Sequence, residues 1–135
     1  MRFLLPYLTV AASFLAIDMV WLGIMAERLY RPVLGELLRP APNPVPAAFF
    51  YLFYPLGLIA FAVVPAVQEH SAFRALTSGM MFGFFTYATY DLTNQATLRN
   101  WSTTLTLKDI LWGTLLAGVS AYLGYLVADR LGTSS

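Results

Sequence analysis

The sequence predicts an all-α, polytopic membrane protein whose 135 residues form one bundle of four transmembrane helices. The first observation behind this prediction is composition: 59% of the residues are hydrophobic and only 11% are charged. Soluble domains carry about 25% charged residues. The second observation is the spacing of the charges, because four stretches of about 20 residues, the length that a spanning helix needs, contain at most one charged residue each. We therefore expect a single transmembrane domain over residues 1–135.

The first helix is predicted near residues 3–25, between Arg2 and Glu27, where Asp18 is the only charged residue. A cleaved signal peptide is the other interpretation of an apolar segment at this position. We discount it, because the segment is too long, contains Asp18, and is not followed by a clear small-residue cleavage site.

The segment 26–45 is predicted to lie at the membrane interface. Its first part, 26–39, mixes charged residues with leucines at helical spacing, which is typical of a short amphipathic helix. The run 40–46 contains four prolines and cannot continue that helix, so we expect an extended spacer that leads into the next span.

Three further helices are predicted near residues 46–67, 73–97 and 109–129. Between the charged residues that flank these three stretches, Asp91 is the only charge. Pro55 is expected to kink the second helix. The link 68–72 is short enough for a tight turn. The link 98–108, which contains Trp101 and several threonines, is predicted to be an ordered loop on the lipid headgroups.

Four consecutive spans bring Asp18, Asp91 and Asp109 to the same side of the membrane. Asp18 and Asp91 lie in the last third of their helices, whereas Asp109 opens the fourth helix, which runs the opposite way. We call this side the acidic end. Five basic residues flank it, against three plus the amino terminus at the other end. That difference favours an acidic end that faces the cytoplasm.

Small and polar side chains share one face of each of three helices, because residues three, four or seven apart lie on the same side. These faces consist of Gly79, Gly83, Tyr87, Tyr90, Asp91 and Asn94 in the third helix, of Asp109, Gly113, Ala117, Ser120 and Gly124 in the fourth, and of Phe14, Asp18 and Trp21 in the first. The glycines of the third helix form a G-x-x-x-G motif, which lets a neighbouring helix approach closely. Turning the three faces inward gives a polar-lined cavity open to the acidic end.

Two of the acids occur in a similar local pattern, Asp18-x-x-Trp21 and Asp109-x-x-Trp112. The two helices that carry them run in opposite directions and the match is short, so the pair does not establish an internal repeat.

The sequence resembles a family of small bacterial inner-membrane proteins that is catalogued as a domain of unknown function. The resemblance rests on the motifs D-x-x-W-L-G at residues 18–23 and Y-D-L-T-N-x-A-T-L at residues 90–98, with Trp101, and on the segments 29–35, 82–89 and 109–113. It covers nearly the whole chain. What it implies is a four-helix membrane protein, with no activity, cofactor or catalytic residue that can be carried over.

An aspartate inside a membrane helix costs about 2.5–3.5 kcal/mol on insertion scales, which makes it a candidate for function. For Asp91 and Asp18, a ligand-binding role and an interhelical hydrogen bond that fixes packing both stay open. For Asp109, a capping role at the start of its helix is the favoured interpretation. Anchoring at the membrane interface is predicted for Trp21, Trp101, Trp112, Tyr30, Tyr51 and Tyr54.

Several classes of site find no support in the composition. The chain has no cysteine and one histidine, His70, so disulfides, iron–sulfur clusters and thiolate metal sites are excluded, and no metal site is predicted. No nucleophile motif is present. A net charge of +1 does not indicate a nucleic-acid partner.

The function predicted first is the binding of a lipid-like or small amphipathic molecule in a polar pocket near one leaflet, with the aspartates as acid and base if the protein is an enzyme. The predicted ligand-binding residues are Asp18, Trp21, Tyr87, Tyr90, Asp91, Asn94, Asp109 and Trp112. Two alternatives stay open: a small transporter or proton relay, and a structural or accessory subunit. Membrane lipids, a small apolar ligand and a homo-oligomer or membrane-complex partner are the expected partners.

Overall fold

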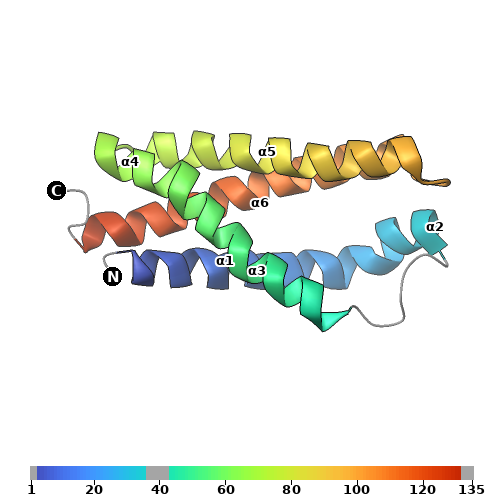
Figure 1. The fold of residues 1–135 in the computed structure, drawn as a ribbon, viewed down its shortest axis with the longest axis horizontal. Helices are drawn as coiled ribbons and strands as arrows, with labels where there is room; N and C mark the ends of the chain where they lie inside the picture. The colour runs from blue at the N-terminus through green and yellow to red at the C-terminus, as the bar shows by residue number, and fades with distance from the viewer. Residues whose placement is uncertain (1–2, 36–42, 132–135) are drawn as a thin grey trace.

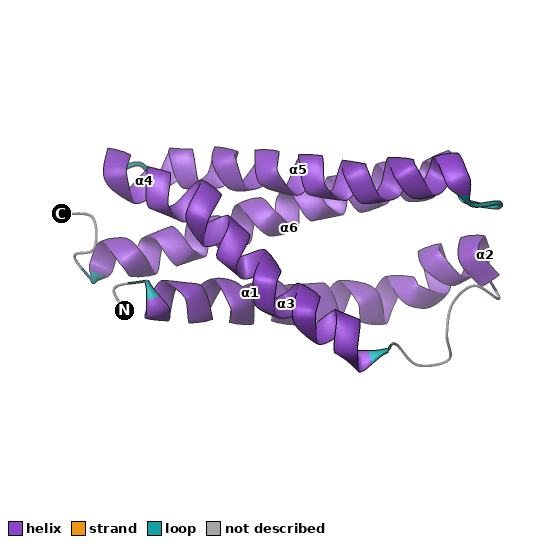
Figure 2. Cartoon of the chain, viewed as in Figure 1, coloured by secondary structure: helices purple, strands orange, loops and turns teal. Residues whose placement is uncertain are grey.

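The computed structural model describes residues 3–35 and 43–131, and in this part of the chain the elements are helices without any strand (Figure 2). In chain order the elements are α1 (Leu4–Met25), η1 (Ala26–Tyr30), α2 (Arg31–Leu34), α3 (Pro44–Leu58), η3 (Ile59–Val63), α4 (Val64–Glu69), α5 (Ala72–Thr97) and α6 (Thr103–Arg130). The segments η1 and η3 are π-type turns that continue the helices on either side. The elements therefore make four long helices, which we call α1–α2, α3–α4, α5 and α6.

The predicted all-α membrane bundle is confirmed. Three segments are long and apolar enough to cross a membrane, Leu4–Tyr30, Pro44–Glu69 and Thr103–Arg130. The helix α5 has a comparable length of 26 residues, but it is less apolar, because it carries threonines, one serine, glycines and two side-chain amides. Large apolar side chains such as Phe61 and Phe73 are exposed on the outside of the bundle, as lipid-facing residues are.

Figure 1 shows α5 and α6 side by side along most of their length, with α1 next to α6 and antiparallel to it. The helix α3 crosses α1 obliquely, and η3 returns the chain to α5. The start of α1, the end of α6 and the α4–α5 turn lie at one end of the bundle, whereas α2 and the α5–α6 turn lie at the other. This is the arrangement that gathers the polar residues at the acidic end.

The α5–α6 pair is tightly packed because small residues line the seam between the two helices. A methyl group on Gly83 would lie 2.4 Å from the backbone oxygen of Gly113 and 2.7 Å from Cβ of Ala117. A methyl group on Gly79 would lie 2.7 Å from Cβ of Ala121. The two helices therefore approach to a distance that only glycine permits, which is the packing expected from the G-x-x-x-G motif.

The predicted loop 98–108 is wrong over its second half, because α6 begins at Thr103 rather than near residue 109. The hydroxyl of Ser102 accepts a hydrogen bond from the backbone nitrogen of Leu105 at 3.0 Å and so caps the new first turn. Thr103 and Thr104, which the sequence predicts to lie in a loop, therefore form the start of α6. Trp101 is buried, with 8% of its surface exposed, and packs with Leu29 and Leu105.

The predicted interfacial segment 26–45 also differs from the structure. Residues 26–34 continue the first helix through η1 and α2, and the helix ends at Gly35, whose φ is +50°. At the other side, α3 begins at Pro44 inside the predicted extended spacer. Asn43 caps this helix by accepting from the nitrogen of Val45 at 3.1 Å, and a proline fits the first turn because no helical partner exists for its missing N–H. Residues 36–42 lie outside the described part.

A proline follows each π turn within two residues. The turn η1 ends two residues before Pro32, and η3 ends two residues before Pro65. A proline inside a helix lacks a donor and its ring clashes with the carbonyl four residues earlier. A wider turn at that position relieves the clash without ending the helix. Pro55 lies inside α3, which stays helical to Leu58.

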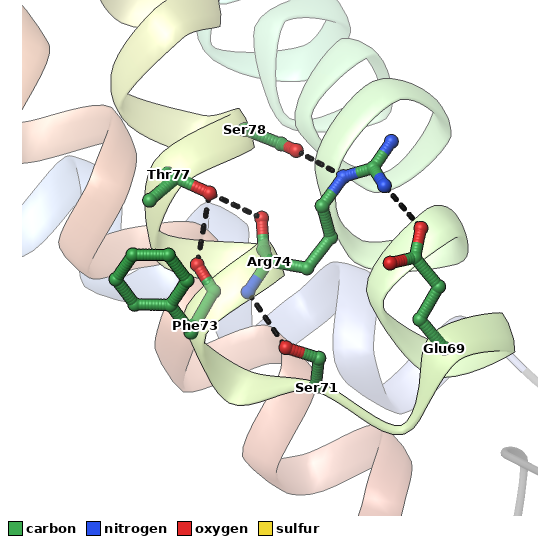
Figure 3. Close-up of polar contacts among 6 residues, drawn as sticks. All are labelled: Glu69, Ser71, Phe73, Arg74, Thr77 and Ser78. Carbon is green, nitrogen blue, oxygen red and sulfur yellow. Dashed lines mark hydrogen bonds and ion pairs between the residues drawn. The ribbon is translucent and has the colours of Figure 1, made fainter.

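The link between α4 and α5 is the predicted tight turn (Figure 3). His70 ends α4 in a left-handed conformation with φ of 52°, and the Ser71 hydroxyl accepts from the nitrogen of Arg74 at 3.0 Å. The Arg74 side chain pairs with Glu69 and donates to the hydroxyl of Ser78 at 2.8 Å. These contacts join Glu69, Ser71, Arg74 and Ser78 to one another within the turn.

We predict that Gly83→Ala destabilises the protein by about 1–3 kcal/mol, because the added methyl group meets a backbone oxygen that cannot move away alone. The matched control is Gly23→Ala in α1, where an added methyl group has no atom within 4 Å. That substitution should be neutral or stabilise by about 0.5–1 kcal/mol through helix propensity. Unfolding in detergent, followed by circular dichroism, measures both. Equal effects of the two substitutions would contradict the tight seam.

Candidate functional site

Three buried carboxyl groups lie at the acidic end. Asp18 of α1 and Asp109 of α6 each expose 6% of their surface, and Asp91 of α5 is fully buried. The carboxyl group of Asp91 interacts directly with that of Asp109. We call these three residues the carboxyl cluster. It lies where the last third of α1 and of α5 passes the first turns of α6, as the order of the helices requires.

Asp18 has hydrogen-bond donors on both of its oxygens. The Tyr51 hydroxyl of α3 donates to Oδ2 at 2.5 Å, and the indole Nε1 of Trp112 in α6 donates to Oδ1 at 3.1 Å. Side chains of three helices therefore meet at this carboxyl group, and the Asp18 side chain is held by hydrogen bonds from α3 and from α6. This is the interhelical packing role that the sequence left open for Asp18.

Asp109 accepts a hydrogen bond from a tyrosine of η1. The hydroxyl of Tyr30 donates to Oδ1 of Asp109 and accepts a hydrogen bond from Nε1 of Trp21 at 2.8 Å. The rings of Trp21 and Trp112 stack on each other, with centroids 4.3 Å apart and planes 8° from parallel. Asp109 is thus not a simple helix cap, because α6 begins a turn and a half before it.

Asp91 differs from the other two acids. Both of its carboxyl oxygens are buried, and in the described part of the chain no donor lies in hydrogen-bonding geometry to either one. Its neighbour Asp109 is a second carboxyl group, and one of the two donates to the other only when the pair holds a proton. Buried polar groups are almost always hydrogen-bonded, so an unpartnered carboxyl requires an explanation.

Tyr87 lies beside the carboxyl cluster. Its ring covers Gly113, since a methyl group there would lie 2.1 Å from Cγ of the ring. Its hydroxyl lies within electrostatic range of Asp18 and Asp109. The ring of Tyr54 stands perpendicular to it, with the centroids 6.3 Å apart. The tyrosine therefore reaches the acids only because residue 113 has no side chain.

Tyr90 and Asn94 lie at the rim of the cluster rather than inside it. Tyr90 is 58% exposed, and its ring meets the edge of Trp101 at 5.9 Å. Asn94 is half-buried and interacts with Tyr90. The structure brings the other predicted site residues together, namely Asp18, Trp21, Tyr87, Asp91, Asp109 and Trp112.

Sequence reasoning missed Tyr30 and Tyr51 as site residues, since both were interpreted as interfacial anchors. Each of them donates to one acid of the carboxyl cluster. A signal for Tyr51 was present, because Pro55 and Leu58 follow at helical spacing and all three share the inner face of α3. No such signal exists for Tyr30, whose position depends on the π turn.

A second polar network closes the acidic end. Nε1 of Trp101 donates to the hydroxyl of Thr106 at 3.0 Å, and that hydroxyl donates to Oε1 of Gln95 at 2.7 Å. Nε2 of Gln95 donates to the hydroxyl of Thr103 at 2.9 Å. The network ties the end of α5 to the start of α6. Trp101 in turn packs on Leu29, which holds η1 against this turn.

Within residues 3–35 and 43–131, no ion pair joins a basic side chain to the carboxyl cluster. The ion pairs seen in residues 3–35 and 43–131 join Arg31 to Glu27 and Arg74 to Glu69, and neither involves an acid of the cluster. Over the same residues, no three His, Cys, Asp or Glu side chains are arranged to hold a metal ion. The described site is therefore acidic and aromatic.

We predict that Tyr51→Phe destabilises the protein by about 1–2 kcal/mol, because it removes the hydroxyl that donates to Asp18 and leaves a buried acceptor unpaired. The matched control is Tyr122→Phe in α6, whose hydroxyl lies on an exposed side chain and makes no hydrogen bond in the described chain. Thermal unfolding of both variants in detergent measures the difference. An effect as small as that of the control would show that the Tyr51–Asp18 contact does not hold α3 to α1.

The comparison with protein families gives one result. The family model described as a predicted membrane protein, DUF2177, matches residues 3–126. The matched range includes the carboxyl cluster and both tyrosines that donate to it. No curated protein and no solved structure matches the chain. The chain therefore belongs to DUF2177, a family of predicted membrane proteins.

Proposed function

We propose that this chain is a multi-pass protein of the bacterial inner membrane that binds a lipid-like or small amphipathic molecule at its acidic end. The observation that supports the proposal is Asp91, whose two carboxyl oxygens are buried without a donor. Leaving a buried group unpaired costs about 1–3 kcal/mol, and more if it is charged. A ligand that donates hydrogen bonds to Asp91 offsets this cost, so binding and the stability of the site are linked.

The surroundings of the cluster fit an amphipathic ligand. Aromatic side chains lie near the acids: Trp112 donates to Asp18 and stacks on Trp21, and the ring of Tyr87 covers Gly113. The outer faces of the helices are apolar and meet lipid. A molecule of this kind keeps its apolar part in the bilayer while its head group reaches Asp91, and Tyr90, which precedes Asp91 in the chain, is 58% exposed and interacts with Asn94. Membrane lipids are thus both solvent and candidate ligands.

The adjacency of two carboxyl groups also suits acid–base chemistry. Asp91 and Asp109 interact directly, and only Asp109 is held by a tyrosine. Two acids in different environments are the arrangement in which one can donate a proton while the other accepts one. If the bound molecule is a substrate, this pair is the one that acts on it.

We predict that Asp91→Asn abolishes binding of the molecule without lowering the stability of the ligand-free protein, because the substitution keeps the shape and removes an unpaired buried acid. Native mass spectrometry of the detergent-solubilised protein detects a co-purifying small molecule, and thermal unfolding reports stability. The matched control, Asp129→Asn, changes an exposed aspartate near the other end of α6 and should keep the molecule bound.

Two results would count against the proposal. The first is a wild-type protein with nothing bound and with the same behaviour as the Asp91 and Asp18 variants. The second is a marked loss of stability in Asp91→Asn, again with nothing bound to the wild type, which favours a structural or accessory subunit whose acids fix helix packing.

A proton relay is the second candidate, and the direct contact between Asp91 and Asp109 is the observation that favours it. Transport across the membrane also needs a polar path to the other end of the bundle. From Tyr87 towards the α4–α5 turn, the described seam contains small residues in close contact, such as Gly79 and Ala121. The inward face of α6 also carries the buried hydroxyl of Ser120, which has no hydrogen-bond partner among the described residues. This packing supports a closed pocket over a channel.

Reconstitution in liposomes that contain a pH-sensitive dye separates the two candidates. Under the binding proposal, wild-type protein and Asp91→Asn give the same slow proton leak when a potential is applied. A proton flux that the wild type supports and Asp91→Asn abolishes would favour the relay instead.

A further inference from the structure

The carboxyl cluster has no internal source of positive charge among the described residues. It contains three acids, and both ion pairs of the described chain lie elsewhere. Like charges repel strongly in apolar surroundings, where the effective dielectric constant is low. Protons or a bound cation must therefore balance the cluster.

The free acceptors of the cluster are few and lie together. Both oxygens of Asp18 are occupied by Tyr51 and Trp112. One oxygen of Asp109 accepts from Tyr30, which leaves the other without a donor in the described chain. Both oxygens of Asp91 are unpartnered as well, and the two carboxyl groups are neighbours. When both carboxyl groups are ionised, the pair thus offers three free oxygens to one ligand.

A primary ammonium group matches this set. It carries one positive charge and three N–H donors, as the side chain of lysine does. A quaternary ammonium has the charge but no donor, and an alcohol has one donor and no charge. A hard metal ion prefers six or more oxygen ligands, which the described residues do not supply.

The aromatic rings around the acids suit the same ligand. The faces of tryptophan and tyrosine rings attract cations. Tyr87 presents such a ring beside the acids and has its hydroxyl within electrostatic range of Asp18 and Asp109. Aromatic walls also keep water away, which strengthens the attraction between an ammonium group and a carboxylate.

We infer that the molecule bound at the acidic end carries a primary ammonium head group, which donates its three N–H bonds to the free oxygens of Asp91 and Asp109. This inference rests on the proposed function, of which it specifies the ligand class. The apolar part of the ligand extends into the bilayer, so the class is a long-chain amine or a lipid with an amino head group.

Four probes with the same twelve-carbon tail test the inference on the purified full chain in nanodiscs: dodecylamine, dodecyltrimethylammonium, dodecanol and dodecanoate. The intrinsic fluorescence of Trp21 and Trp112, next to the cluster, reports binding, and the shift in Tm confirms it. We expect dodecylamine to bind at least tenfold more tightly than the other three. Asp91→Asn and Asp109→Asn should each weaken it at least tenfold, whereas the exposed control Asp129→Asn should not.

The outcomes separate this inference from the proposed function. Equal binding of dodecanol and dodecylamine, with both lost in Asp91→Asn, keeps an amphipathic ligand and overturns the ammonium head group. Equal binding of dodecyltrimethylammonium and dodecylamine shows that the three N–H donors are not needed, and so overturns the primary ammonium head group. Equal binding of dodecylamine to wild type and Asp91→Asn, in variants shown to be folded by circular dichroism, overturns the site. If no probe binds and no molecule co-purifies, the proposed function fails as well.

Discussion

The close approach of α5 and α6 is the constraint on which the site depends. Gly83 lies against the backbone of Gly113, and no larger residue fits at that point. Because the two helices are fixed there, Asp91, about two turns after Gly83, and Asp109, about one turn before Gly113, must lie beside each other. The absence of a side chain at residue 113 also admits the ring of Tyr87. A seam built for packing thus determines which polar groups share a buried space.

Much of the fold follows from the sequence, because a charge is costly in hydrocarbon and its absence over about 20 residues is a strong signal. The start of α6 is not predicted in this way, because Thr103, Thr104 and Lys108 are typical of a loop. In the structure, Ser102 caps the first turn of α6, and these residues are helical. The first and third helices were placed to within a residue or two of α1 and α5. Helix existence is thus set by composition, and helix ends by individual hydrogen bonds.

The candidate site could be predicted in part. Helical spacing aligned the acids on inward faces, and the order of the helices placed them at one end. The partners of the acids could not be read in the same way, because they depend on how α3 crosses α1 and on the course of η1. An aromatic residue near a membrane boundary has two common roles, as a lipid anchor and as a buried donor, and spacing alone does not separate them.

The two D-x-x-W motifs contact each other in the structure, which the sequence alone does not predict. Antiparallel packing of α1 and α6 sets them at the same level, so that Trp21 and Trp112 stack. Each tryptophan then serves the acid of the other motif: Trp112 donates to Asp18 directly, and Trp21 reaches Asp109 through Tyr30. The pair behaves as one locally twofold unit, whether or not it arose from a repeat.

The position of Tyr30 in the site depends on the π turn at Ala26–Tyr30 and on the number of residues between Trp21 and Tyr30. Tyr30 follows Trp21 by nine residues, which in an uninterrupted α-helix is about 2.5 turns and puts the two side chains on opposite faces. The wider turn changes that phase and lets them meet. Loss or gain of a single residue between Trp21 and Tyr30 would rotate the tyrosine away from Asp109. Among related chains, length variation should therefore fall after Gly35 and be absent from this stretch.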